Sequence, residues 1–508
     1  MLSLVHVLEW RAAVTPDAVA VSDHAGDQLS YAELAAATDR RAAEFAAARI
    51  GPGDVVPVIA RNQIGWVTAM MGLIRAGALP AAVNWRLALP EITALMRAME
   101  PVAIVADEDC GTAAKQAGAG LDYPVPVLMT GADIAGTPGT GTPPPRPVDR
   151  LRGPEPAVLV HTSGTTGTPK LVPQTHQQLI TSAIFMKLEV PEALPGTRHL
   201  SAMPLYHPGT LANLAYVLLT GGHLHLVRRF ETVSFVDELA ARRIQLTLLV
   251  PTLIQAVTAE VSARALRPDL TSLVEILYGA SPIRPDVLAR AISVLRCRFR
   301  QIYASAETGP LPISSLCPAD HDPALGFLST AGQPSLGWEV RLGERGEIQV
   351  RGATPLPRYW ADPGATSAAL TSDGFYRTGD VGTIDSRGYL TIIDRLRDVI
   401  ITGGENVFPG EVEAVLADHA AVADVAVIGI PDDRWGETVH AVVVAHTGPY
   451  TGDQFTAELI GYARQRLAGF KCPTGVTLVP SLPRNAAGKL LRASLRAPFW
   501  VGRDRWVS

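Results

Sequence analysis

The sequence predicts an α/β protein with a large N-terminal domain of layered α/β subdomains and a β-rich subdomain, followed by a small C-terminal α+β domain. Helix-like and strand-like segments alternate before residue 130 and again between residues 157 and 278. This alternation is typical of a largely parallel sheet covered by helices. After residue 337 the segments shorten and are separated by Asp-Gly and Arg-Gly turns, which favours β structure. Beyond Asp398 helix-like and strand-like segments form a further compact pattern, which indicates a separate domain.

The N-terminal elements follow from periodicity. Residues 31–48 are Ala-rich with helical spacing, and a second helix-like segment, 70–75, precedes Gly77. Between residues 131 and 152 Pro and Gly are too dense for a helix or strand, so we expect either a domain boundary or a long ordered loop. Apolar runs predict strands at 55–60, 102–106, 157–161, 246–250 and 273–278.

The C-terminal third has shorter elements. A helix is expected to open at Pro409, where proline suits the first turn of a helix. A second helix is expected at 455–467, and we find no internal repeat. The expected strands are 347–350, 375–378, 389–393, 422–430 and 439–445.

Composition excludes several classes of protein. The 508 residues include 47% hydrophobic but only 18% charged residues, below the roughly 25% of typical soluble domains. The longest uncharged stretch, 201–227, is broken by Pro and Gly, so we expect no membrane span. Glu9 and Arg11 interrupt the N-terminal region, which lacks the pattern of a secretion signal.

Charge and cysteine content favour a cytoplasmic enzyme. The net charge is -5 and there is no Lys/Arg block, so a nucleic-acid partner is not expected. The four cysteines are scattered and form no CxxC pair, which argues against both a disulfide framework and a cysteine metal site.

The most informative segment is His161-Thr-Ser-Gly-Thr-Thr-Gly-Thr-Pro-Lys170, which follows an apolar strand. Glycines let backbone N–H groups turn inward and hydroxyl side chains add donors, so such a loop is suited to wrap phosphate oxygens. It is not a Walker A loop, because the spacing of its glycines differs and proline precedes the lysine. Taken alone, it could also be a flexible polar turn.

This segment resembles the signature loop of the adenylate-forming (ANL) superfamily. That superfamily contains acyl- and aryl-CoA synthetases, adenylation domains of peptide synthetases, and luciferases. Four further motifs follow in the order of the family and extend the resemblance over nearly the whole chain. They are Tyr303-Ala-Ser-Ala-Glu307-Thr, Tyr376-Arg-Thr-Gly-Asp380, the segment from Asp394-Arg-Leu-Arg-Asp398 to Glu413, and Pro483-Arg-Asn-Ala-Ala-Gly-Lys489.

The resemblance implies a two-step reaction. A carboxylate attacks the α-phosphate of ATP and pyrophosphate leaves, and a thiol, usually that of coenzyme A, then captures the acyl-adenylate and AMP is released. The implied ligands are ATP, Mg²⁺, coenzyme A and a small carboxylic acid. The residues implied to cradle the departing phosphates are Thr162, Ser163, Gly164, Thr165, Thr166, Gly167 and Lys170.

Four charged residues receive roles by the same resemblance. Glu307 would hold Mg²⁺, and Lys489 would lie between the substrate carboxylate and the α-phosphate, where negative charge concentrates. Asp380 would accept hydrogen bonds from the ribose, and Arg395 would lie near the ribose and phosphate. Taken singly, Glu307 could be a solvated carboxylate and Asp380 the cap of a turn, so the ordered set of motifs carries the assignment.

The resemblance also places residues around adenine and the acyl group. His207 lies in a Pro-Leu-Tyr-His segment that borders the acyl pocket in CoA synthetases, although a core histidine is the plainer interpretation. One departure concerns Ala306, which replaces a threonine whose hydroxyl donates to the α-phosphate in the family. Ser305 and Thr308 are the nearest hydroxyls that could compensate. The remaining residues implied for adenine and the pocket are Gly279, Ala280, Ser281, Tyr303, Ala304 and Ser305.

Family members rotate the small domain between the two half-reactions. The implied pivot is Arg397, with an N-terminal adenylation domain at 1–396 and a mobile C-terminal domain at 397–508. The rotation would withdraw Lys489 and bring Gly403 and Gly404 to the pantetheine arm. Without the resemblance, Arg397 indicates only a charged linker.

The acid and the acceptor stay open at this stage. Tyr206-His207 stands where amino-acid-activating relatives place a Phe-Asp pair, so an α-amino acid is disfavoured. Aromatic, fatty and polycyclic acids are all compatible with the small residues of the pocket. The acceptor is coenzyme A or the same arm on a carrier protein. A catalytically silent carboxylate-binding relative and a luciferase-like oxygenase are further alternatives, and the oligomeric state is not predicted.

Overall fold

The computed structural model describes residues 2–131, 154–162, 170–352, 358–403, 405–446, 452–484 and 490–501. Nearly all of the expected connection at 131–152 therefore lies outside the described residues. The chain divides into two compact units, which we call unit 1 (residues 1–339 and 351–376) and unit 2 (residues 340–350 and 377–508). The boundary that we predict between residues 396 and 397 marks where the small domain would rotate, and it stays a prediction.

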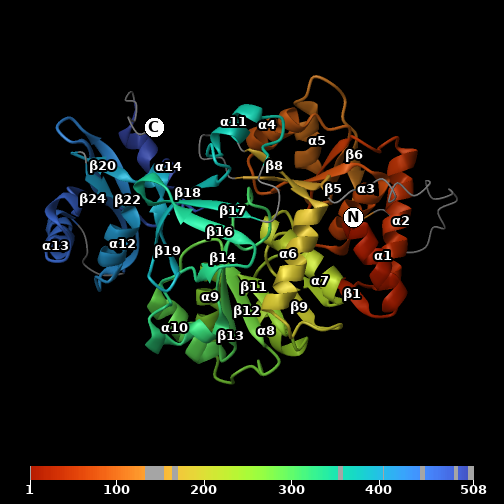
Figure 1. Cartoon of the computed structure of the whole chain (residues 1–508), viewed down its shortest axis with the longest axis horizontal. Coiled ribbons are helices and arrows are strands. Elements are labelled where there is room, and N and C mark those ends of the chain that lie inside the picture. Colours follow the sequence, from red (N-terminus) through yellow and green to blue (C-terminus); the bar gives the residue numbers. More distant parts are fainter. Residues whose placement is uncertain are drawn as a thin grey trace. The chain divides into compact units, whose positions relative to one another are not determined.

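Unit 1 contains a six-stranded sheet in the order β6-β5-β3-β4-β7-β8. Neighbouring strands are parallel except for β7 and β8, which are antiparallel. Helices α2 (Tyr31–Ala47), α3 (Ile64–Ala76), α4 (Leu89–Met99) and α5 (Gly111–Ala119) accompany this sheet (Figure 1). The strands are β3 (Val55–Ile59), β4 (Leu79–Ala82), β5 (Ile104–Ala106), β6 (Val127–Met129), β7 (Pro156–His161) and β8 (Leu171–Thr175).

A nine-stranded sheet forms the rest of the core of unit 1, in the order β15-β14-β13-β12-β11-β9-β10-β1-β2. Its central strands are parallel from β13 to β1. The strands are β1 (Val19–Asp23), β2 (Gln28–Ser30), β9 (Arg198–Ser201), β10 (His223–Leu226), β11 (Leu246–Leu249), β12 (Glu275–Gly279), β13 (Arg298–Tyr303), β14 (Ser314–Leu316) and β15 (Gln333–Pro334). The accompanying helices are α1 (Leu4–Val14), α6 (His176–Glu189), α7 (Pro208–Thr220), α8 (Thr232–Ala241), α9 (Pro251–Ala263) and α10 (Pro285–Leu295).

Unit 2 holds a five-stranded sheet whose two faces carry different apolar layers. Because side chains alternate along a strand, Val425 and Val427 face one layer with helices α12 (Pro409–Ala417) and α13 (Gly452–Arg464), while Ala426 and Ile428 face the other. Leu495, on α14 (Arg492–Arg496), packs against that second layer. The strands are β20 (Ile400–Thr402), β21 (Glu405–Val407), β22 (Val422–Asp432), β23 (Gly436–Ala445) and β24 (Gly475–Leu478).

A four-stranded sheet lies mostly in unit 2 and gives the β-rich part of the fold. Its strands are β16 (Trp338–Leu342), β17 (Glu347–Gly352), β18 (Tyr376–Ile384) and β19 (Leu390–Arg395). The short α11 (Pro363–Ala368) precedes β18 in sequence.

The predicted α/β class is confirmed, and the differences lie at element ends. The strand expected from residue 102 begins at Ile104, and the strand expected from residue 273 begins at Glu275 because the Leu273 N–H closes a turn on Leu270. β11 ends at Leu249, since Pro251 opens α9. The last large helix begins at Gly452 and ends at Arg464, three residues before the expected end. Capping and turn hydrogen bonds, which periodicity does not report, decide these boundaries.

Candidate active site

The two ends of the loop that the sequence singles out lie next to each other. β7 and β8 are antiparallel, with His161 opposite Leu171. The Thr162 N–H donates to the Lys170 carbonyl at 2.9 Å, which holds the two ends of the segment together. Ser163, Gly164, Thr165, Thr166 and Gly167 lie between these ends and outside the described residues. The loop thus leaves the carboxyl end of β7, the edge at which open α/β sheets bind ligands.

Lys170, Glu307 and Tyr359 meet beside this loop, and we call them the carboxylate–lysine cluster. The Tyr359 hydroxyl donates to Glu307 Oε1 at 3.4 Å. The Lys170 ammonium nitrogen lies 4.5 Å from the centroid of the Tyr359 ring. Burial, followed by the charge of Glu307, raises the pKa of Tyr359 to about 12, so its hydroxyl stays protonated as a donor. No motif spacing connects Tyr359 to Glu307, so the sequence offered no sign of its role.

The cluster has the donor chemistry that Mg²⁺ prefers when it accompanies a nucleotide. Mg²⁺ is bound through one or two carboxylates together with phosphates and waters. Glu307 supplies one partly exposed carboxylate, and the described residues contain no group of three or more His, Cys, Asp or Glu that could cage a metal. The residues present therefore fit a metal ion shared with a phosphate ligand, and Glu307 would hold it.

The segment that carries Glu307 also contains the two hydroxyls nearest to Ala306, those of Ser305 and Thr308. Ser305 Oγ accepts the Thr308 N–H at 3.1 Å, and the Thr308 hydroxyl is bonded to the Ser305 carbonyl at 3.2 Å. Thr308 is only 1% exposed. The two neighbouring hydroxyls thus bond within their own turn.

The loop after β12 carries the residues predicted to lie near adenine. A Cβ at Gly279 would stand 2.2 Å from the Ile302 carbonyl oxygen on β13, so only glycine fits there. Ala280 has a φ of +68°, a left-handed conformation that costs a non-glycine residue about 1 kcal/mol. Strain of this kind gathers at ligand sites. Ser281 follows directly. Tyr303 ends the adjacent parallel strand β13 and Ala304 and Ser305 follow it, so the two loops leave the same sheet edge.

His207 is the N-cap of α7, and the hydrogen bond that it accepts there defines its tautomer. Its Nδ1 accepts the Gly209 N–H at 3.2 Å as the helix N-cap. Burial lowers the pKa of His207 to about 4, so at neutral pH the ring is uncharged and its proton lies on Nε2. Asn62 fixes the preceding segment, since its side chain donates to the Met203 carbonyl and accepts the Leu205 N–H. The sequence offered no sign of this role for Asn62.

Unit 2 brings together two of the predicted nucleotide residues. Asp380 lies opposite Arg395 in the β18–β19 register, and their side chains form an ion pair at 2.7 Å. Arg397 lies in the short turn that follows β19, beside Asp398. Gly403 has a φ of +58°, and a Cβ there would stand 2.8 Å from the Trp435 ring. Gly404 and Lys489 lie outside the described residues.

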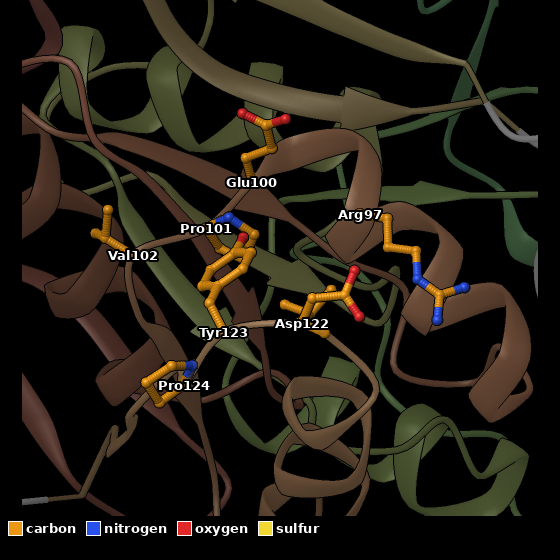
Figure 2. A pocket seen from close by; sticks show the side chains of 8 residues that line it. Arg97, Glu100, Pro101, Val102, Asp122, Tyr123 and Pro124 are labelled. Atoms are coloured by element: carbon orange, nitrogen blue, oxygen red, sulfur yellow. The ribbon is translucent and has the colours of Figure 1, made fainter.

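A cavity of about 510 Å³ lies in another part of unit 1 (Figure 2). Its lining includes Val102 before β5 and Tyr123 before β6, at the amino ends of these strands. The sheet runs parallel from β5 to β7, so this cavity lies at the edge opposite the loop after β7. None of the predicted site residues that the structure describes lines it.

A phosphate-binding type of loop after a parallel strand, with a carboxylate and a lysine beside it, is the arrangement of a nucleotide-dependent enzyme. Two family models match the chain and define its class more closely. One describes an AMP-binding enzyme and matches residues 8–360, and the other describes the C-terminal domain of an AMP-binding enzyme and matches residues 411–489. The chain therefore belongs to the family of AMP-binding enzymes, and the predicted membership of the adenylate-forming superfamily, of acyl- or aryl-CoA synthetase type, is confirmed.

Similar proteins cover almost the full length of the chain. A feruloyl-CoA synthase of Amycolatopsis sp is 35% identical over 96% of this chain and 97% of its own length. A fatty acid–[acyl-carrier-protein] ligase of Streptomyces coeruleorubidus is 31% identical over 100% of this chain and 98% of its own. The o-succinylbenzoate coenzyme A synthetase of Bacillus subtilis, solved in complex with ATP and magnesium ion, superposes with a TM-score of 0.84 at 28% identity, covering 96% of this chain and 98% of that one. Within the described part of the chain, no helix is long and apolar enough to cross a membrane.

Proposed function

We propose that the protein is an ATP-dependent acyl-CoA synthetase. It activates a carboxylic acid as acyl-AMP with release of pyrophosphate, then transfers the acyl group to coenzyme A with release of AMP. The observation that carries this function is the carboxylate–lysine cluster, in which the lysine that ends a hydroxyl-rich loop and a carboxylate both contact Tyr359. Charges of both signs are what a metal–triphosphate ligand requires.

The first half-reaction needs negative charge to be neutralised where it concentrates. Lys170 stabilises the departing pyrophosphate, and the neighbouring loop supplies N–H and O–H donors to its oxygens. Mg²⁺, when bound, screens the phosphate oxygens from the attacking carboxylate. Glu307 holds the ion, and Tyr359 keeps the Glu307 carboxylate aligned with its hydroxyl.

Residues of unit 2 bind the nucleoside and supply a further catalytic cation, Lys489. Asp380 accepts hydrogen bonds from the ribose hydroxyls, and Arg395, held by its ion pair with Asp380, lies near the phosphate. Lys489 lies between the substrate carboxylate and the α-phosphate. Rotation at Arg397 then withdraws Lys489 and brings the Gly403–Gly404 segment to the thiol. These roles are proposed from the motifs that the residues belong to.

The acyl side of the site favours an acid without an α-amino group. His207 is uncharged at neutral pH, with a proton on Nε2, and it is preceded by Tyr206, so this segment offers no carboxylate to an ammonium group. The feruloyl-CoA synthase relative is the reason to place aromatic acids first in a substrate search. Fatty and polycyclic acids follow.

A carrier protein is the second candidate acceptor. The relative that loads fatty acids onto an acyl carrier protein covers the whole chain at 31% identity, so the same pantetheine arm on a protein is a specific alternative to free coenzyme A. The silent-relative alternative is disfavoured because Lys170, Glu307, Asp380 and Lys489 are all retained.

The test is AMP release from ATP and Mg²⁺ with a panel of ferulate, other aromatic acids, fatty acids and polycyclic acids. Each acid is assayed alone, with coenzyme A, and with a phosphopantetheinylated acyl carrier protein. AMP that requires both one acid and coenzyme A supports the proposal and identifies the acid. AMP that requires the carrier protein moves the acceptor to the second candidate, and no AMP under any condition refutes the proposed ligase.

A further inference from the structure

The described residues on either side of positions 485–489 are bonded to each other. Arg484 and Leu490 form an antiparallel bridge, and the Leu491 N–H donates to the Pro483 carbonyl at 2.9 Å. Leu490 also packs against the apolar layer that contains Ala426 and Ile428. The residue directly after Lys489 is therefore fixed against the sheet of unit 2.

Three residues after Lys489 stands Arg492, whose guanidinium reaches two other segments of unit 2. Its Nη2 donates to both carboxylate oxygens of Glu413, on α12, at 2.8 and 2.6 Å. Glu413 also accepts the Val427 N–H at 2.7 Å, which links α12 to β22. Arg492 and Glu413 are 19% and 17% exposed at their side chains, so water screens this pair only weakly.

The third segment is the turn that holds the proposed pivot. Arg492 Nη1 lies 4.0 Å from Asp398 Oδ2, and Arg496 Nη1 lies 3.7 Å from Asp398 Oδ1. Asp398 is 9% exposed at its side chain and directly follows Arg397. One carboxylate beside the pivot thus faces two arginines of α14, the helix that begins three residues after Lys489.

The surroundings of Arg492 favour its charged form. Burial opposes the charge of Arg492, but the carboxylates of Glu413, Asp394 and Asp398 outweigh it, and the pKa of Arg492 is raised. Burial outweighs Arg492 and the Val427 N–H at Glu413, so the pKa of Glu413 is raised. Removing Arg492 would leave Glu413 as a buried carboxylate without its cation, which is costly for a folded protein.

We infer that Arg492 is a positioning residue that connects the Lys489 segment to Glu413 of α12 and to Asp398 beside the pivot. With this link intact, the hinge turn, α12 and the Lys489 segment move as one body when the chain rotates at Arg397. Without it, the residues that directly follow Lys489 are no longer tied to the turn beside the pivot. The inference rests on the proposed function and adds to it a device that couples the hinge to one catalytic residue.

The link should matter for only one half-reaction. In the proposed mechanism Lys489 acts in adenylate formation and is withdrawn during thioester formation. A misplacement of about 1 Å at a catalytic group costs about 100-fold in rate. A substitution that merely destabilises unit 2 would lower both half-reactions together, so the ratio between them separates positioning from structural support.

The experiment uses the full-length protein and three variants. Arg492→Leu removes the charge, and Arg492→Lys keeps the charge but lacks the planar fork that reaches two carboxylates. Lys471→Gln is the matched control, because Lys471 forms an ion pair at 2.7 Å with Glu411 on the same helix α12. Adenylate formation is measured by ATP–pyrophosphate exchange with the acid that gives the highest AMP release in the panel, and thioester formation by supplying that acyl-adenylate with coenzyme A.

We expect Arg492→Leu to slow pyrophosphate exchange by about 100-fold, Arg492→Lys by about 10-fold, and thioester formation in either by less than about 3-fold. Hydrogen exchange of the backbone at 490–496 should rise in both Arg492 variants, whereas Lys471→Gln should match the wild type. Equal losses in both half-reactions, or exchange at 490–496 no different from the control, would overturn the inference. The exchange measurement needs no substrate, so it still tests whether Arg492 holds residues 490–496 in place if the wild type releases no AMP, and that failure would count against the proposed function alone. If Arg492→Leu does not fold, Arg492→Lys carries the test.

Discussion

The two units hold their important charges in opposite ways. In unit 1, Glu307 is partly exposed and receives one hydrogen bond from the described residues, a long one of 3.4 Å from Tyr359. In unit 2, Glu413 receives two short bonds from Arg492 and one from the Val427 backbone. Both are acidic side chains in motifs of the family, but of the two only Glu413 is saturated by neighbours that the structure describes.

This difference teaches which charges serve ligands and which serve geometry. A carboxylate that the protein does not saturate keeps lone pairs for a metal or a substrate, and it gains its best partners only when the ligand arrives. A saturated, buried pair offers nothing to a ligand and instead fixes the relative positions of the segments that it joins. Substitutions in the first group should change activity, and those in the second should change stability or coupling.

The largest expected effect concerns the saturated pair. Glu413→Ala should lower the free energy of unfolding of unit 2 by about 3–5 kcal/mol, because it leaves Arg492 without its main partner. Lys471→Gln should cost about 0–1 kcal/mol, since that pair is more exposed. Urea unfolding followed by hydrogen exchange within unit 2 measures both. Equal effects of the two variants would contradict the distinction between the buried pair and the more exposed pair.

Glu307→Gln should show the opposite profile. Losing a preorganised charge at the phosphates should slow adenylate formation by about 10²–10³-fold, while the free energy of unfolding should change by less than about 0.5 kcal/mol. Pyrophosphate exchange across a Mg²⁺ titration and a thermal melt give the two values. Glu108→Gln, at an exposed position of unit 1, is the control. A large loss of stability would mean that Glu307 is structural.

Acid should affect the units unequally. Burial lowers the pKa of His199 to about 4, and six other histidines of unit 1 are similarly shifted; in unit 2 the pKa of His440 is lowered. The unfolded chain therefore binds more protons between pH 6.5 and 4, so stability falls as pH drops through that window. One such buried histidine should cost about 2 kcal/mol at pH 5. The other six are His161, His176, His207, His223, His225 and His321.

Calorimetry and hydrogen exchange at pH 7.5 and pH 5 test this difference. Unit 1 should open first at pH 5, whereas unit 2 should retain most of its protection. If both units lost protection in parallel, the buried histidines would not be the groups that control acid stability.

The smallest effect should come from Tyr359, which joins the carboxylate and the lysine. Tyr359→Phe removes the bond to Glu307 and should slow adenylate formation by about 5-fold, the value of one modest hydrogen bond. Tyr359→Leu also removes the ring beneath the Lys170 ammonium and should lose about 5-fold more. Steady-state kcat/KM for ATP measures both. A phenylalanine variant as active as the wild type would show that Glu307 is aligned by other groups.

Much of this architecture was accessible from local sequence. Periodicity located the strands and the main helices, and Pro409 marked the start of α12, because these signals act through neighbouring residues. Gly279 and Gly403 were singled out by motif, and each occupies a position where a Cβ would collide. Element ends were less accurate, since turn and capping hydrogen bonds decide them.

Other features could not be predicted from one sequence. The partners of the Thr308 hydroxyl near Ala306 depend on where that hydroxyl points, and the structure bonds it to the Ser305 carbonyl. The tautomer of His207 required the N-cap geometry of α7. Asn62 contacts Met203 from 141 residues away, a separation at which sequence patterns carry no information.

The sequence alone determined the fold class, the order of the elements and the five motifs of the family, because each is encoded within a short window. Only the tertiary structure decided which charges meet. The segment of Tyr359 is bonded to β8 through the Trp360 N–H and the Leu171 carbonyl, and Tyr359 meets Glu307 across 52 residues. Helix packing brings Arg492 to Glu413 across 79. The energy of a charge depends on the partners and the water around it, and the folded chain, not its local sequence, supplies both.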